Sequence, residues 1–163
     1  AVVRNAACPS PPPVPAPSAS VSLAPAQEAK LTDDAGRLDS YATQHFAASY
    51  AGTALSTVED ALLVYRKPLA AFDDWVLHTF PRICLVVVDA LHSQRELYAL
   101  QARIDADNDY WRAHGIRINT TSPRVDGSAV EVGTQDVDRA KAAFPARYGP
   151  DAPIAIVAEA PVS

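Results

Sequence analysis

The sequence has no methionine and no apolar stretch long enough to cross a bilayer. A membrane-spanning helix needs about 20 apolar residues, so the short apolar run at residues 83–88 indicates a buried strand instead. The missing methionine and the small first residues, Ala1-Val2-Val3, lead us to expect a mature chain whose targeting segment has been removed. We therefore expect a secreted, extracellular protein without a transmembrane segment.

Motifs for catalysis and metal binding are also missing. The sequence has no glycine-rich phosphate loop, no Gly-x-Ser-x-Gly elbow and no histidine pair at metal-binding spacing. The acidic residues 105–109 resemble the start of a calcium loop, but Tyr110 and Ile116 stand where that loop needs glycine and glutamate. Cys84 lies among aliphatic residues, which favours burial over reactivity. We expect no catalytic residue, no metal and no cofactor.

A basic surface is not expected either, because the net charge is −5. This charge argues against nucleic acid as a partner. With 163 residues, 48% of them apolar, the chain is long enough for one domain with a core and an arm. We predict an arm over residues 1–30 and a single domain over residues 31–163.

Proline is abundant near the start of the chain. Its ring fixes φ and removes a backbone donor, so the arm should be excluded from helices and central strands. We expect an extended, stiff polyproline-II segment suited to a partner's groove or to tethering. The predicted partner-binding positions in the arm are Pro9, Pro11, Pro12, Pro13, Val14 and Pro15.

The two cysteines, Cys8 and Cys84, leave two possibilities open. In an exported chain they would form one disulfide, which contributes about 4 kcal/mol when it closes a long loop in the chain-entropy model. Alternatively, Cys84 is an unpaired buried residue, and Cys8 is free or bonded to another chain.

The remaining pattern predicts an α+β fold. We expect a helix from about residue 32 to Gly52, a hairpin over residues 54–65 and a short helix over residues 69–80. From residue 83 to 158 the predicted order is β-α-β-β-α-β, which defines a ferredoxin-like unit with one antiparallel sheet. Its first helix should begin at Ser93 and end at Gly115, and Pro145 should end or kink its second. No repeat of the solenoid type is visible.

Several of these segments occur in an order that resembles a known family. They are residues 61–65, the helix with Ser93, Leu97, Leu100 and Ile104, the strand Val130-Glu131-Val132, and Arg147-Tyr148-Gly149 before the last strand. Together they resemble the pro-regions of secreted actinobacterial serine proteases with the chymotrypsin fold, of the alpha-lytic and streptogrisin type. The resemblance covers residues 33–159. We expect a free-standing partner or a cleaved pro-region here, since no protease domain follows Ser163.

The resemblance implies how the chain would bind. Pro-regions of that family act as intramolecular chaperones and inhibitors; their sheet pairs with a hairpin of the protease, and their C-terminal tail occupies the substrate cleft. Carried over to this sequence, the implied sheet edge and tail comprise Val130, Val132, Ile154, Ile156, Pro161, Val162 and Ser163.

Three functional hypotheses follow. The first is a secreted, non-enzymatic module that docks on a chymotrypsin- or trypsin-like protein as inhibitor, chaperone or adaptor. The adaptor version resembles, in outline, the linking subunits of secreted actinobacterial toxin particles. The second is a cell-envelope structural protein displayed through its proline-rich arm. The third is an enzyme, which would need His45 or His78 beside a carboxylate in a cleft.

Overall fold

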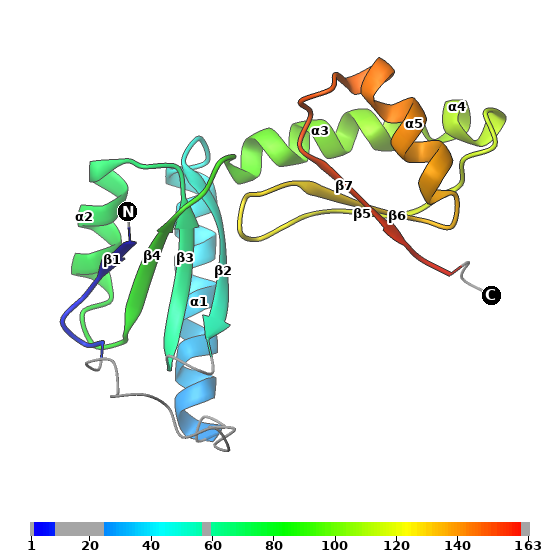
Figure 1. The fold of residues 1–163 in the computed structure, drawn as a ribbon. Helices are drawn as coiled ribbons and strands as arrows, with labels where there is room; N and C mark the ends of the chain where they lie inside the picture. Colours follow the sequence, from blue (N-terminus) through cyan, green and yellow to red (C-terminus); the bar gives the residue numbers. More distant parts are fainter. Residues whose placement is uncertain (1, 9–24, 57–59, 161–163) are drawn as a thin grey trace.

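The computed structural model describes residues 2–8, 25–56 and 60–160. Its first half is a four-stranded sheet with two helices packed on one face (Figure 1). The strand order is β1-β4-β3-β2; β2 is antiparallel to β3, β3 is parallel to β4, and β1 is antiparallel to β4. The elements are β1 (Val2–Arg4), α1 (Pro25–His45), β2 (Tyr50–Ser56), β3 (Ala61–Arg66), α2 (Ala70–Thr79) and β4 (Leu85–Asp89).

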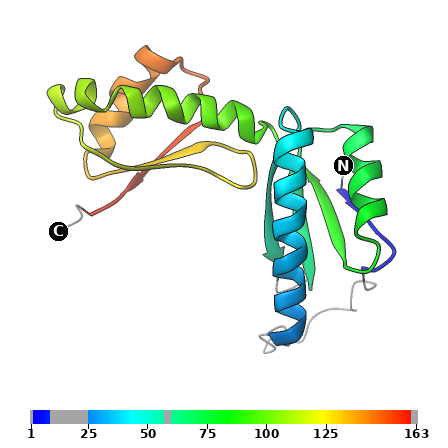
Figure 2. The ribbon, with the colours of Figure 1, turned by 180° about the vertical axis from the view of Figure 1, so that it is seen from behind.

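The second half is a three-stranded sheet with its helices on one face, as the opposite views of Figures 1 and 2 show. The strand order is β5-β6-β7, with β5 antiparallel and β7 parallel to the central β6. The elements are α3 (Gln94–Ala106), α4 (Asn108–Ala113), β5 (Ile118–Pro123), β6 (Val130–Thr134), α5 (Val137–Tyr148) and β7 (Ile154–Ala158).

The two halves share one topology, which we describe as a first unit (residues 25–90) and a second unit (residues 93–160). Each unit has a leading helix, an antiparallel hairpin, a crossover helix and a third strand parallel to the second. Even the hairpin irregularity recurs, because the register shifts between Tyr50 and Gly52 and again between Ile118 and Thr120. Each of these hairpin positions in the second unit lies 68 residues after its counterpart.

The same spacing relates the two cores. In the crossover helices, Phe72 and Val76 match Ala140 and Phe144, and all four are buried. The start of the second strand also makes an equivalent backbone hydrogen bond in each unit. The Leu62 amide donates to the Cys84 carbonyl, and the Val130 amide donates to the Pro153 carbonyl. Because topology, register and core positions all repeat, the chain is an internal structural duplication. Only β1 has no counterpart in the second unit among the described residues.

The ferredoxin-like sheet predicted over residues 83–158 is not what the described chain forms. The α+β class and the β-α-β-β-α-β order are present, but β4 pairs with β1 and β3 in the first sheet. The remaining three strands form a separate sheet. The order of elements was correct, whereas the partner of β4 was wrong, because an order of elements does not specify which strands hydrogen-bond.

Three of the predicted helices also have boundaries that differ from the prediction. α1 begins at Pro25, where a missing amide costs nothing in the first turn, and it ends at His45, so Gly52 belongs to β2 instead of ending the helix. The predicted long helix breaks at Asp107 into α3 and α4 before Gly115, whose φ is +78°. Pro145 lies inside α5, which continues to Tyr148.

The two units meet where the β5–β6 turn packs against β2. A Cβ on Gly52 would lie 2.5 Å from the Val125 carbonyl oxygen, and one on Gly127 would lie 2.5 Å from the His92 carbonyl oxygen. A side chain would therefore not fit at either position, and glycine permits the close approach. A Lys67–Glu96 ion pair with an N···O distance of 2.6 Å also joins the units, and its hydrogen bond lowers the pKa of Glu96.

Gly127→Ala should therefore destabilise the protein. Gly127 has φ of +72°, which strains a residue with a side chain, and the new methyl group would lie 2.5 Å from the His92 carbonyl oxygen and 2.7 Å from the Ala90 Cβ atom. We expect the free energy of unfolding to fall by about 1–3 kcal/mol, measured by urea denaturation. Gly36→Ala is the matched control, because nothing lies within 4 Å of that position in α1, and it should stabilise by up to about 1 kcal/mol. Equal effects of both substitutions would contradict this account of the joint.

Candidate functional site

The outer edge of the first sheet is occupied by the chain's own N-terminal segment. Val2, Val3 and Arg4 pair antiparallel with Val88, Val87 and Val86. The Val3 side chain packs against the core of the first unit. Residues 2–4 and 25–30 are therefore parts of the fold, which corrects the prediction that residues 1–30 form an arm. The addition of a strand to a sheet edge is also a recurrent mode of peptide recognition.

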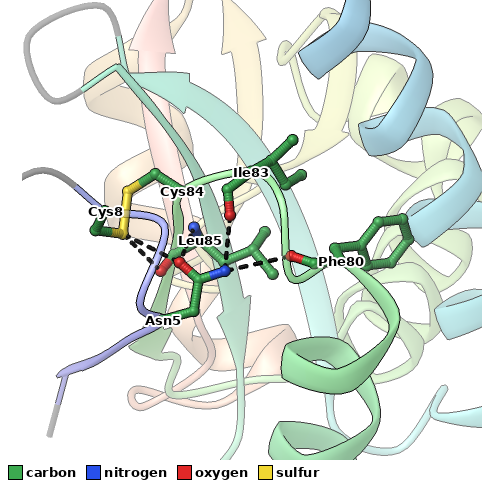
Figure 3. The surroundings of a disulfide bond; sticks show 6 residues. All are labelled: Asn5, Cys8, Phe80, Ile83, Cys84 and Leu85. Atoms are coloured by element: carbon green, nitrogen blue, oxygen red, sulfur yellow. Dashed lines mark hydrogen bonds between the residues drawn. A yellow bond between two sulfur atoms is a disulfide. The ribbon is translucent and has the colours of Figure 1, made fainter.

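An asparagine and a disulfide hold this segment in place (Figure 3). The Asn5 side-chain amide donates to the Ile83 carbonyl at 2.7 Å and the Phe80 carbonyl at 3.3 Å. Its carbonyl oxygen accepts from the Leu85 amide at 3.1 Å. The Cys8–Cys84 disulfide, with a sequence separation of 76, then fixes the segment to the start of β4. The intramolecular pairing is thus confirmed.

The equivalent edge of the second sheet is β7, and no described strand pairs with its outer side. The Val130 amide donates to the Pro153 carbonyl and the Glu159 amide to the Thr134 carbonyl. In a parallel ladder this pattern turns the backbone groups of Ala155 and Val157 toward β6. Those of Ile156 and Ala158 consequently face away from the sheet. A partner strand would find donors and acceptors there.

The predicted binding residues divide into three groups. Ile154 and Ile156 belong to β7, which is an edge strand of the second sheet. Val130 and Val132 lie on the central strand β6, which is paired with β5 on one side and β7 on the other, so they cannot form a docking edge. The arm and tail positions fall outside the described residues; these are Pro9, Pro11, Pro12, Pro13, Val14, Pro15, Pro161, Val162 and Ser163.

Just after β7, the Glu159 side chain lies over the sheet face that the described helices do not cover. The Thr120 hydroxyl donates to the Glu159 carboxylate, and the Asn119 side chain donates to the Glu159 carbonyl at 3.3 Å. Gly133 lies beneath this carboxylate, and a Cβ there would overlap the Glu159 Oε2 atom, so a side chain at this position would displace the carboxylate. The direction of the chain is therefore fixed up to residue 159.

The principal charged clusters link structural elements. Arg66 is almost fully buried at the end of β3 and pairs with Asp73 of α2 at 2.7 Å and Asp89 of β4 at 2.6 Å. Asp107, at the break between α3 and α4, accepts from Arg147 and from the Tyr148 hydroxyl of α5. Within the described ranges, no group of three or more histidine, cysteine or acidic residues could hold a metal ion.

In the described part of the chain, His92 contacts a carboxylate, that of Glu96, at 3.2 Å on the surface, whereas neither His45 nor His78 has such a contact. His45 stacks on Tyr41 with ring centroids 4.1 Å apart, and His114 packs on Tyr110 at 4.2 Å. The His78 ring contacts the Asp74 backbone carbonyl one turn earlier in α2. The two Tyr-x-x-x-His pairs, 69 residues apart, were a sequence signal of the duplication that the pattern analysis missed.

No family model matches this chain, and no curated protein matches it significantly. The described residues include no helix both long and apolar enough to cross a bilayer. The geometry of the open β7 edge is therefore the main basis for a functional hypothesis.

The disulfide should be needed to keep β1 on β4. In the Cys8→Ser/Cys84→Ser variant, we expect the free energy of unfolding to fall by about 2–4 kcal/mol. Amide hydrogen exchange separates local from global effects, because Val87 faces β1 whereas Val86 and Val88 face β3. Val87 should lose more protection than its two neighbours. Uniform loss over β4 would instead mean that the disulfide stabilises the whole first unit without holding this strand.

Asp107 should make the stability of the second unit depend on pH. Its hydrogen bond with Arg147 lowers its pKa from 3.8 to about 2. Because the folded pKa is the lower one, the stabilisation is complete above 3.8 and is lost as the pH falls toward 2. Asp107→Asn should therefore lower the melting temperature at pH 7, and its difference from the native chain should shrink toward pH 2. Asp109→Asn, an exposed control, should change little; an Asp107→Asn difference that is constant with pH would contradict this role.

Proposed function

We propose that this chain is an extracellular, non-enzymatic module that binds a protein of chymotrypsin-like fold through the β7 edge. In this role it would act as an inhibitor, chaperone or adaptor. The observation that carries the proposal is the asymmetry between two equivalent edges. In the first unit, β1 adds to β4 and completes the sheet. In the second unit, the matching edge of β7 is open among the described residues.

The resemblance to protease pro-regions supports the same surface. In that family the sheet pairs with a protease hairpin, and the C-terminal tail reaches the substrate cleft. In this chain the open edge and the fixed exit at Glu159 belong to the same strand end. A partner strand on β7 would therefore lie beside the start of the tail. The disulfide is compatible with an extracellular site of action.

The alternative, display in a cell envelope through the proline-rich segment, has less support. Both ends of that segment are attached to the fold, since Cys8 is bonded to Cys84 and α1 begins at Pro25. Residues 1–30 cannot be deleted to test it, because β1 and the disulfide would be lost. Deletion of residues 9–24 is the appropriate change. Release of the folded protein from cells would favour envelope display, and unchanged binding to a soluble protease would favour the docking proposal.

Binding should be measured with catalytically inactive streptogrisin-type and trypsin-type proteins, and inhibition with their active forms. We expect a stable one-to-one complex in calorimetry. Ala158→Pro removes an outward backbone donor at the β7 edge and should weaken binding about tenfold or more, since proline cannot donate to a ladder. Ala158→Ser keeps that donor and serves as the control. The proposal is wrong if no such protein binds, or if Ala158→Pro binds as tightly as the control.

A further inference from the structure

A small apolar notch lies beside the free edge of β7, between this strand and α5. Its volume is about 180 Å3. Phe144 and Pro145 of α5, Ile154 and Ile156 of β7, and Ala152 of the connecting loop form its apolar lining. The notch and the unpaired backbone of Ile156 are therefore neighbouring features of one edge.

In the first unit, the position that corresponds to the notch is occupied. The residues that correspond to the notch are Val76, Leu77, Ile83, Leu85 and Val87, which lie 68 or 69 residues earlier and belong to or pack against the first core. Val3 of β1 packs against this same core. One added strand thus satisfies the β4 edge and supplies an aliphatic side chain to the position beside it.

We infer that the notch is the specificity pocket of the β7 edge. A segment of the partner protein would add antiparallel to β7 and insert one aliphatic side chain of valine size between α5 and β7. The inference rests on the proposed function for the edge itself, and it adds which sequence the edge selects. The register follows from the first unit: Val3 pairs with Val87, so the inserted residue would pair with Ile156.

A positive charge beside the notch indicates which residues the bound segment should carry. Lys141 lines the notch, and no acidic partner pairs with it among the described residues. Its counterpart in the first unit is Asp73, which is neutralised by Arg66. Lys141 lies one turn of α5 before Phe144, near the C-terminal end of β7. In an antiparallel partner strand, it would therefore face the residue two places before the inserted one. An acidic side chain there would complement the ammonium group. The predicted ligand is an extended segment with the pattern acidic-x-aliphatic.

The chain's own β1 supplies the sequence of a test ligand. The probe is a labelled peptide Ser-Glu-Val-Val-Arg-Asn-Ala, which carries β1 with glutamate two places before the inserted valine. Binding to the whole chain is measured by fluorescence anisotropy. Replacement of the second valine by aspartate should weaken binding about tenfold or more, because the aliphatic burial is lost. N-methylation of the second valine should weaken it about fivefold or more, while N-methylation of the first valine, whose amide faces outward, should not.

Two variants of the chain complete the test. Ala152→Phe fills the notch and should abolish the preference for valine over aspartate, provided that circular dichroism shows an unchanged fold. Lys141→Glu should weaken binding of the glutamate peptide and strengthen binding of a peptide with lysine at that place. Equal binding of the valine and aspartate peptides, or no effect of Lys141→Glu on either peptide, would overturn the inference.

The outcomes separate this inference from the proposed function. Peptide selectivity without any bound protease-like protein would retain the notch and reject the proposed partner. Protease-like binding that Ala152→Phe leaves unchanged would retain the partner and reject the notch. Sedimentation of the free chain provides a third result, because a dimer that the peptide dissociates would show that a second copy, instead of a different protein, occupies the edge.

Discussion

The unpaired backbone of a sheet edge is the constraint on which this structure depends. In a three-stranded unit of the type found here, the third strand has unpaired backbone donors and acceptors along its outer side. In the first unit this edge is completed by β1, which Asn5 and the Cys8–Cys84 disulfide hold in place. A strand of only three residues would bind its edge weakly without those two attachments. The disulfide therefore holds β1 on the β4 edge, in addition to lowering the entropy of the unfolded chain.

The duplication turns this local arrangement into an internal comparison. Two units with the same register, bulge and buried positions differ in whether a strand pairs with the outer edge of the third strand. They also differ in the charged contacts near that edge, since Arg66 and Asp73 in the first unit correspond to Thr134 and Lys141 in the second. The third-strand edge of the first unit is paired by the chain's own β1, whereas the corresponding edge of the second unit has no paired strand among the described residues.

Most elements were predictable because they depend on local signals. The hairpin at β2 and β3, the helix α2 and the strand β7 follow from hydrophobic periodicity and turn residues. The Ser93 cap was equally clear, and its side chain accepts from the Glu96 amide. β1 was missed because three residues before a proline-rich segment carry no periodicity. The break at Asp107 was missed, and the residues that Asp107 contacts there, Arg147 and Tyr148, lie about 40 residues away in sequence.

The sequence by itself determined the α+β class and the order of most elements, because these follow from local propensity and alternation. The candidate edge at Ile154 and Ile156 came from the resemblance to protease pro-regions instead. The sequence left the partner of Cys8 open. The tertiary structure decided that Cys8 bonds to Cys84, that β4 belongs to the first sheet, and that Val130 and Val132 lie in a central strand. Strand pairing is a contact between residues far apart in the chain, and a local pattern that fits several neighbours cannot choose among them.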